Sequence, residues 1–144
     1  MHPTVMIIDD DEINQIMMEF MINGFNCEAV TALNGIEGLD LARARAPGII
    51  FCDIQMPVLN GYQTLARLRA DPVLAAIPMI AMTAHAMVGD RERILAAGFD
   101  GYISKPFELN EIGRQLHAHL PVRTPSVPRR YQRLSASTHA LNRA

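Results

Sequence analysis

Residues that can handle a phosphoryl group or a metal ion follow four short apolar runs of the sequence. They are Asp9 and Asp10, Asp53, Thr83 and Lys105, at the ends of the runs 5–8, 49–52, 79–82 and 102–104. Short apolar runs bounded by Gly, Pro and Asp are typical of buried strands in a parallel sheet. Because ligands bind outside the carboxyl ends of such strands, we expect these side chains to gather at one edge of the sheet. Lys105 is also the only lysine in the chain.

This set of side chains suits phosphoryl or metal chemistry. Neighbouring carboxylates raise one another's pKa unless a cation neutralises them, and their oxygens suit a hard divalent ion, Mg²⁺ before Ca²⁺. An aspartate can also act as the nucleophile that accepts a phosphoryl group, while Thr83 and Lys105 contact its oxygens. A single aspartate after a strand is more often the N-cap of the next helix. Four such strand ends favour the chemical interpretation.

The segments between these runs are predicted to be helices. Apolar residues at positions 13, 16, 17, 20 and 21 predict an amphipathic helix that ends at Gly24. Met17, Met18 and Met21 are interpreted as core or flanking packing, with a partner-binding methionine surface as the alternative. A short strand is predicted over 27–30. Four more helices complete the pattern: one follows Asn34, one follows Asn60-Gly61, and two span 90–97 and 109–120. Five strands alternating with five helices predict an α/β sandwich of three layers around a doubly wound, five-stranded parallel sheet.

Length and composition bound the class of protein. A chain of 144 residues that is 49% hydrophobic has room for one domain with a substantial core. It has no apolar run of membrane-spanning length and no signal-peptide pattern at its start, so we expect a cytoplasmic protein. The net charge is −2, and residues 121–144 carry five arginines and no acid, so residues 1–120 carry −7. The acidic body argues against a general nucleic-acid surface, and we expect 121–144 to be a flexible basic tail.

Four segments carry a family pattern: Met6–Glu12, Asp53–Pro57 with Asn60-Gly61, Met82–Ala84 and Gly101–Phe107. In order and separation they resemble the receiver domain of bacterial two-component response regulators. The resemblance covers about residues 4–120, and we assign residues 1–120 to this domain. It implies a flavodoxin-like fold and a signalling phosphoacceptor, not an enzyme, which assists only its own phosphorylation and dephosphorylation. The stretch 83–93 is similar to receivers of phosphorelays, both stand-alone ones and those fused to hybrid sensor kinases.

The resemblance implies a role for each acidic residue. Asp53 would take a phosphoryl group from a phosphohistidine on a histidine kinase or a histidine phosphotransfer protein. Asp10, Asp53 and the main-chain carbonyl of Gln55 would ligate Mg²⁺, or Mn²⁺ in its place. Asp9 would hold the ion through water.

The resemblance also implies a switch. Thr83 and Lys105 would contact the phosphoryl oxygens, and movement of Thr83 would let Tyr102 turn inward. The face built from helix 90–97, the fifth strand and the last helix would then change for a downstream protein. Gln55 and His85 correspond to positions that tune the lifetime of the phosphoryl group. The peptide bond between Lys105 and Pro106 is typically cis in the family.

The expected partners are therefore proteins. They are a histidine kinase or phosphotransfer protein and a downstream target, with no direct contact to nucleic acid or membrane. The protein is expected to be a monomer or a weak dimer in the bacterial cytoplasm. Gln15 stands where many relatives carry Arg or Lys, which we interpret as a change in surface and partner electrostatics.

Three other functions were compatible with parts of the pattern. Asp9-Asp10-Asp11 approximates the opening motif of haloacid-dehalogenase-like phosphatases, in which Asp9 would be the nucleophile, but this alternative leaves Asp53 unexplained. A nucleotide-binding flavodoxin-like module is disfavoured because the first strand-to-helix turn is acidic and lacks a Gly-rich phosphate cradle. A receiver that works without phosphorylation is disfavoured because every expected site residue is present.

Overall fold

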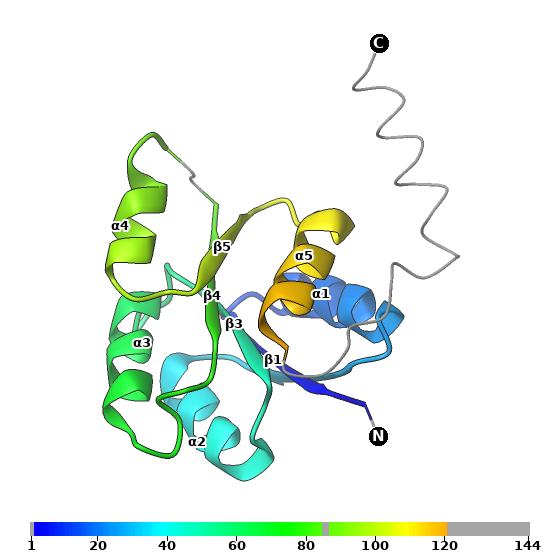
Figure 1. Ribbon diagram of the computed structural model, residues 1–144, viewed down its shortest axis with the longest axis horizontal. Helices are drawn as coiled ribbons and strands as arrows, with labels where there is room; N and C mark the ends of the chain where they lie inside the picture. Colours follow the sequence, from blue (N-terminus) through cyan, green and yellow to red (C-terminus); the bar gives the residue numbers. More distant parts are fainter. Residues whose placement is uncertain (1, 85–86, 121–144) are drawn as a thin grey trace.

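The computed structural model describes residues 2–84 and 87–120 (Figure 1). His85 and the predicted tail 121–144 lie outside the described residues. The strands are β1 (Thr4–Ile8), β2 (Glu28–Ala32), β3 (Ile49–Asp53), β4 (Met79–Thr83) and β5 (Gly101–Ser104). The helices are α1 (Glu12–Gly24), α2 (Gly35–Arg45), α3 (Gly61–Ala70), α4 (Asp90–Ala96) and α5 (Leu109–His119). The predicted alternation of strands and helices is confirmed, with β2 beginning one residue later and extending two residues further than predicted.

All five strands form one parallel sheet in the order β2-β1-β3-β4-β5. Because every strand runs in the same direction, the carboxyl ends of β1, β3, β4 and β5 meet at one edge of the sheet. The order reverses between β1 and β3, where the chain leaves β1 for β2 on one side and returns to β3 on the other. Ligands of doubly wound sheets bind at such a reversal.

Helices cover both faces of the sheet, which makes the three predicted layers. Figure 1 shows α2, α3 and α4 on one side of the strands and α1 and α5 on the other. Alternate residues of each strand feed the two faces: Met6 and Ile8 pack into the core under α2–α4, whereas Val5 and Ile7 pack into the core under α1 and α5. The central strands are buried on both faces, as their unbroken apolar sequences predict.

Helix α1 buries a different face from the one that the apolar repeat suggested. Ile13, Ile16 and Phe20 have 68%, 65% and 59% of their surfaces exposed, while Met18 and Ile22 are buried. The interpretation of position 17 as core is also wrong, since Met17 is exposed, and Met21 is half-buried against the core. Both stripes of the helix are apolar enough to be buried, and only one faces the sheet. The other leaves an apolar surface on the outside of the molecule.

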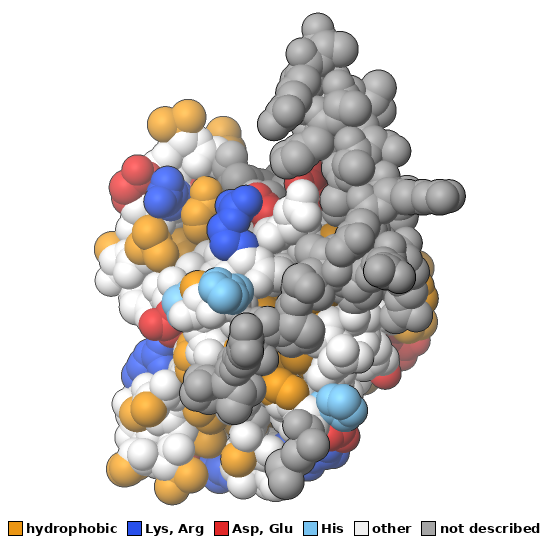
Figure 2. Space-filling view, turned by 45° about the vertical axis from the view of Figure 1, so that its right-hand side comes forward, with side chains coloured by type: hydrophobic (Ala, Val, Ile, Leu, Met, Phe, Trp, Pro, Cys, Tyr) orange, Lys and Arg blue, Asp and Glu red, His pale blue; other side chains and the backbone are white. Residues whose placement is uncertain are grey.

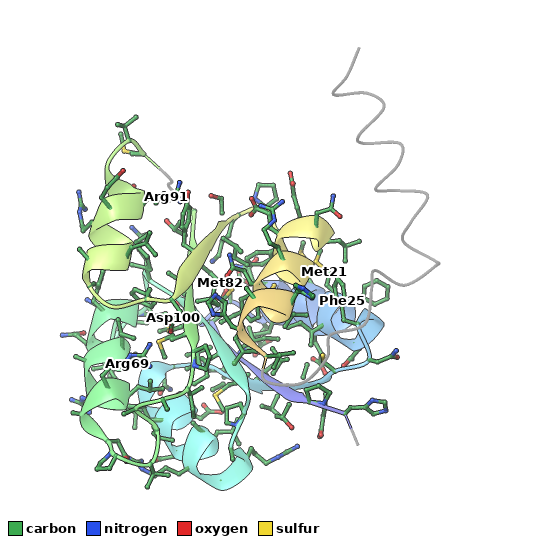
Figure 3. The ribbon with its side chains drawn as sticks, viewed as in Figure 1. Met21, Phe25, Arg69, Met82, Arg91 and Asp100 are labelled. Atoms are coloured by element: carbon green, nitrogen blue, oxygen red, sulfur yellow. The ribbon has the colours of Figure 1, made fainter. Side chains whose placement is uncertain are left out.

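Arg69 joins the loop before β4 to the loop before β5 at the end of the sheet opposite the acidic residues. Its Nη1 donates hydrogen bonds to the carbonyl oxygens of Ala75 and Ile77 at 2.9 and 2.7 Å. Its Nη2 lies 2.7 Å from Asp100 Oδ2, an atom that also accepts a hydrogen bond from the backbone N–H of Met79. Figure 3 shows Arg69 on α3 near Asp100, which precedes β5. The contact sets the starting positions of β4 and β5.

Within the described residues, none of the helices combines the length and the apolar character that crossing a membrane requires.

Candidate functional site

Three carboxylates meet at the edge where the order of the strands reverses. Asp9 follows β1 and Asp53 is the last residue of β3, and these strands are direct neighbours in the sheet. One carboxylate oxygen of each of Asp9, Asp10 and Asp53 lies within 4.8 Å of the others. Asp9 is 0% and Asp53 6% exposed, whereas Asp10 is exposed to solvent. The predicted convergence of acidic side chains is therefore present in the fold.

Lys105 is the cation of this cluster. Its Nζ lies 3.3 Å from Asp9 Oδ2 and 3.3 Å from Asp53 Oδ2. The backbone N–H of Lys105 donates to the carbonyl oxygen of Thr83 at 2.8 Å, which fixes the residue after β5 to the end of β4. The bond between Lys105 and Pro106 is cis, as the family resemblance implied. Counting only the part of the chain that the structure describes, one ammonium group against three carboxylates leaves the cluster with a net charge of −2.

The hydrogen bonding of Asp9 leaves one oxygen directed at the cluster. Asp9 Oδ1 accepts a hydrogen bond from the backbone N–H of Asp11 at 2.9 Å. Asp9 Oδ2 is buried and, within the described residues, makes no hydrogen bond; its contact with Lys105 has the distance of an ion pair only. A buried carboxylate oxygen without a donor, in a cluster of net negative charge, suits a hard divalent cation with oxygen ligands. The residues present therefore fit a metal ion of the Mg²⁺ type.

Burial and neighbouring charge perturb Asp53. Burial raises the pKa of its carboxyl from the ordinary 3.8 to about 6, the Lys105 ammonium opposes that rise, and the charge on Asp9 adds to it. The backbone N–H of Gln55 donates to Asp53 Oδ1 at 3.2 Å, which also favours the ionised form. A carboxylate held in a partly desolvated site by one cation is poised to react or to bind a second cation.

The other predicted site residues occupy different positions around this cluster. Thr83 closes β4, next to β3 in the sheet, and is half-buried. Gln55 is exposed, two residues beyond Asp53. Tyr102 lies in the middle of β5, half-buried against the core under α2–α4. His85 lies outside the described residues.

Gln15 is a residue whose role the sequence interpretation missed. Its side chain is buried, with 8% exposed, so the expectation of a surface change at this position is wrong. Its Nε2 donates hydrogen bonds to the carbonyl oxygens of Asp9 and Ala32 at 2.9 and 2.8 Å. The amide thus fastens the residue after β1 to the end of β2. The spacing of Gln15, Met18 and Ile22 along one helix face is the signal that could have revealed it.

Gly61 is required where the loop after β3 returns to the site. A Cβ atom at this position would lie 2.7 Å from the carbonyl oxygen of Asp53 and 2.7 Å from Ile54 Cα. The backbone N–H of Gly61 donates to the Ile54 carbonyl at 2.8 Å. Asn60 and Gln63 then form a capping box that begins α3. The Asn60-Gly61 pair therefore holds the loop closely against Asp53.

Comparison with known proteins decides the family. The model of the response regulator receiver domain matches residues 5–117. The chain belongs to this family. As a receiver domain it is a component of two-component signalling, and receiver domains act as phosphoacceptors that work with histidine kinases and downstream targets. The alternative of a haloacid-dehalogenase-like phosphatase receives no support from this match.

Relatives and solved structures agree with the assignment. The receiver is 39% identical over 120 residues to the polar-differentiation response regulator DivK of Brucella anthropi, covering 83% of this chain and 98% of the relative. A putative response regulator from Chloroflexus aurantiacus superposes with a TM-score of 0.79 at 28% identity, covering 85% of this chain and 100% of the other. The receiver domain of a Pseudomonas aeruginosa sensor histidine kinase, with magnesium coordinated in its active site cleft, gives a TM-score of 0.75 at 31% identity. That match covers 83% of this chain and 98% of the other.

Proposed function

We propose that Asp53 of this receiver is the residue that accepts the phosphoryl group. The observation that carries the proposal is the position of its buried carboxylate, 3.3 Å from Lys105 Nζ and beside the carboxylates of Asp9 and Asp10. A nucleophile in phosphoryl transfer needs a cation for the incoming phosphoryl oxygens and a site shielded from bulk water. Asp53 combines the two.

The metal-binding role falls to residues around Asp53. Asp10, Asp53 and the main-chain carbonyl of Gln55 would ligate Mg²⁺, or Mn²⁺ in its place, and Asp9 would hold it through water. When bound, the ion supplies positive charge that offsets the net −2 of the cluster and stabilises the charge on the phosphoryl oxygens. The donor-free oxygen of Asp9 supports this assignment.

The transfer step can be written with the residues of the site. An ionised oxygen of Asp53 attacks the phosphorus of a phosphohistidine, a phosphorus–oxygen bond forms, and the phosphorus–nitrogen bond breaks. The electron pair stays on the imidazole nitrogen, which takes up a proton. Lys105 and Thr83 hold the oxygens of the transferred group. Water later attacks the acyl phosphate, releasing phosphate and restoring the carboxylate, and Gln55 and His85 are candidates for setting that rate.

A signal would pass from the site to the surface along β4 and β5. Thr83 closes β4, and its carbonyl oxygen holds the backbone of Lys105. We assign Thr83 and Tyr102 to the switch, in which contact of Thr83 with a phosphoryl oxygen lets Tyr102 turn inward. Tyr102 is half-buried between the core and a surface pocket, so a change in its rotamer would alter the face of α4, β5 and α5.

The exposed stripe of α1 is suited to docking of the protein that donates the phosphoryl group. Ile13, Ile16, Met17 and Phe20 lie three or four residues apart, so they share one face of the helix. The stripe starts two residues after the acidic Asp11, which caps α1. A donor protein packed on the first turn of this stripe would therefore lie close to the acidic cluster that contains Asp53. Residues 1–120 would form this signalling unit, in the cytoplasm and as a monomer or weak dimer.

Phosphorylation by a small donor tests the proposal without a partner protein. The full chain is incubated with acetyl phosphate and Mg²⁺, and the intact mass is measured. We expect one added phosphoryl group in the wild type and in Asp40→Asn, a control that removes an exposed acid of α2, and none in Asp53→Asn. Equal phosphorylation of Asp53→Asn would refute the proposal, as would sustained phosphatase turnover that is lost only in Asp9→Asn.

A further inference from the structure

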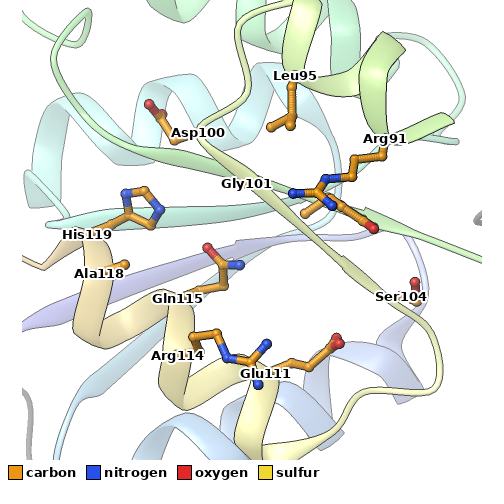
Figure 4. Close-up of a pocket in the computed structure, with 11 residues that line it drawn as sticks. Arg91, Leu95, Asp100, Gly101, Ser104, Glu111, Arg114, Gln115, Ala118 and His119 are labelled. Atoms are coloured by element: carbon orange, nitrogen blue, oxygen red, sulfur yellow. The ribbon is translucent and has the colours of Figure 1, made fainter. Parts of the chain in front are cut away.

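A pocket of about 460 Å³ lies at the β5 edge of the sheet, away from the acidic cluster. Helix α4 forms one wall, α5 forms the other, and β5 runs along the floor (Figure 4). This volume is within the range of about 300 to 1,000 Å³ that is usual for ligand pockets. The pocket is therefore large enough to hold several residues of a partner.

Two arginine side chains that line this pocket can bind an acidic group of a partner. Figure 4 shows Arg91 coming from α4 and Arg114 from α5, on the two walls. Neither makes a hydrogen bond or an ion pair with any residue of the described part of the chain. The space-filling view shows basic side chains interspersed with hydrophobic and acidic ones on the side where α4 lies (Figure 2). Arginine in such a position is suited to bidentate contact with a carboxylate.

The acidic residues of the pocket do not cancel these charges. Asp100 is already held by Arg69 at 2.7 Å and by the backbone N–H of Met79. Glu111, one turn before Arg114 on α5, is not within ion-pair distance of it. Because residues 1–120 carry a net charge of −7, most of the molecule repels an acidic partner. Two guanidinium groups without a partner among residues 2–84 and 87–120 thus make this pocket a local exception on an acidic protein.

The floor of the pocket offers backbone hydrogen bonds as well. Among the described strands β5 pairs only with β4, so its outer edge has no strand partner. Gly101, Tyr102 and Ser104 of this strand line the pocket. A Cβ atom at position 101 would lie 2.5 Å from Gln115 Oε1, so the glycine lets the Gln115 amide lie over the strand. An edge strand next to a pocket can accept an extended peptide as an additional strand.

We propose that this pocket binds a short, extended, acidic segment of a partner protein. The backbone of the segment pairs with the outer edge of β5, and its carboxylates contact Arg91 on one side and Arg114 on the other. An extended peptide fits better than a small phosphate compound because the two cations stand on separate walls with a strand between them. The inference rests on the proposed function in one respect, since Tyr102, assigned to the switch, forms part of the floor.

The direct test is a titration of the ¹⁵N-labelled full chain with an octapeptide of two Glu-Glu-Val-Val repeats, followed by NMR. Adjacent side chains of an extended strand point to opposite faces, so the paired glutamates can reach both walls. The matched probe has Gln in place of every Glu. We expect saturable shifts at residues 101–104 and in α4 and α5 with the acidic peptide, and affinity lower by about fivefold to tenfold for the Gln peptide, because two exposed ion pairs are lost. The double variant Arg91→Gln, Arg114→Gln should lose the same factor.

A control double variant, Arg45→Gln with Arg67→Gln, removes the same charge from α2 and α3 and should bind the peptide as the wild type does. The proposal would be overturned if the Gln peptide bound as tightly as the acidic peptide, or if both double variants lost the same affinity for the acidic peptide. Chemical-shift changes confined to elements other than β5, α4 and α5 would also overturn it. So would saturation of the same residues by inorganic phosphate or a dinucleotide with no effect of the peptide. Acetyl phosphate should still phosphorylate Arg91→Gln, Arg114→Gln, so failure of peptide binding is distinguishable from failure of the phosphoacceptor assignment.

Discussion

The side-chain amide of Gln15 donates a hydrogen bond of 2.9 Å to the carbonyl oxygen of Asp9. A second bond of 2.8 Å from the same nitrogen reaches Ala32, so one buried group joins β1, α1 and β2 directly behind the acidic cluster. Removing this buried donor takes a partner from the Asp9 carbonyl, while the Ala32 carbonyl still accepts from the backbone N–H of Asp9 at 3.1 Å. A buried acceptor that loses its donor costs more than an average hydrogen bond contributes. The position of Asp9 therefore depends on a residue that does not itself belong to the cluster.

Replacement of Gln15 should destabilise the fold. Gln15→Met keeps a side chain of similar length but removes the donor, so the free energy of unfolding should fall by about 1 to 3 kcal/mol. Urea denaturation followed by circular dichroism measures the change. Glu19→Gln, on the exposed face of the same helix, serves as the control. If both variants unfold at the same urea concentration, Gln15 does not fasten the site.

Removal of the charge on Asp53 should make metal-free protein more stable near neutral pH. The pKa of this carboxyl is raised from 3.8 to about 6 in the folded state, so its contribution to stability is fully present below pH 3.8 and is lost as the pH rises through about 6. In the presence of EDTA, the stability of Asp53→Asn relative to the wild type should therefore increase between pH 4 and pH 7. The gain should be on the order of 2 kcal/mol.

Chemical denaturation at a series of pH values measures this difference, with Asp40→Asn as the control for the loss of one charge. Added Mg²⁺ should stabilise the wild type and narrow its gap from Asp53→Asn, because the ion offsets the repulsion among the carboxylates. A difference between the two proteins that does not change across this pH range would contradict the electrostatic description of Asp53.

A change in the exposed stripe of α1 should slow phosphorylation by a donor protein but not phosphorylation by acetyl phosphate. Ile16→Ser removes an apolar side chain that is 65% exposed, so the fold should lose little stability. Phosphotransfer from a cognate histidine kinase should slow by about tenfold, the size of effect expected when one of the few energetically important contacts of an interface is lost. Val73→Ser, which changes a side chain 76% exposed near α3, is the matched control. Equal phosphotransfer to the two variants would exclude α1 as the docking surface.

The sequence predicted the sheet and its reactive edge because both depend on strong local signals. Short apolar runs bounded by Gly, Pro and Asp are typical of buried strands, and Asp9, Asp53 and Lys105 follow them directly, so parallel topology brings them together. The buried face of α1 could not be predicted in the same way. Both stripes of that helix are apolar, and the buried one contains Gln15, whose partners are carbonyl oxygens on β1 and β2. Only the assembled fold shows that these carbonyls are within reach.

The pocket beside β5 could not be predicted from the sequence either. It depends on the spacing of α4 and α5 across the edge strand and on the pairing of Asp100 with Arg69 from α3. Arg91 and Arg114 are 23 residues apart and ordinary in a charged helix surface. Their common environment follows from tertiary packing alone.

The central claim is that Asp53 carries the phosphoryl group as an acyl phosphate. Borohydride reduces an aspartyl phosphate to homoserine, so the protein is treated with acetyl phosphate and Mg²⁺, reduced, digested and mapped by mass spectrometry. The account predicts homoserine at position 53, dependent on the divalent ion and absent without the phosphodonor. Homoserine at position 9, or phosphorylated protein with no homoserine at position 53, would contradict it.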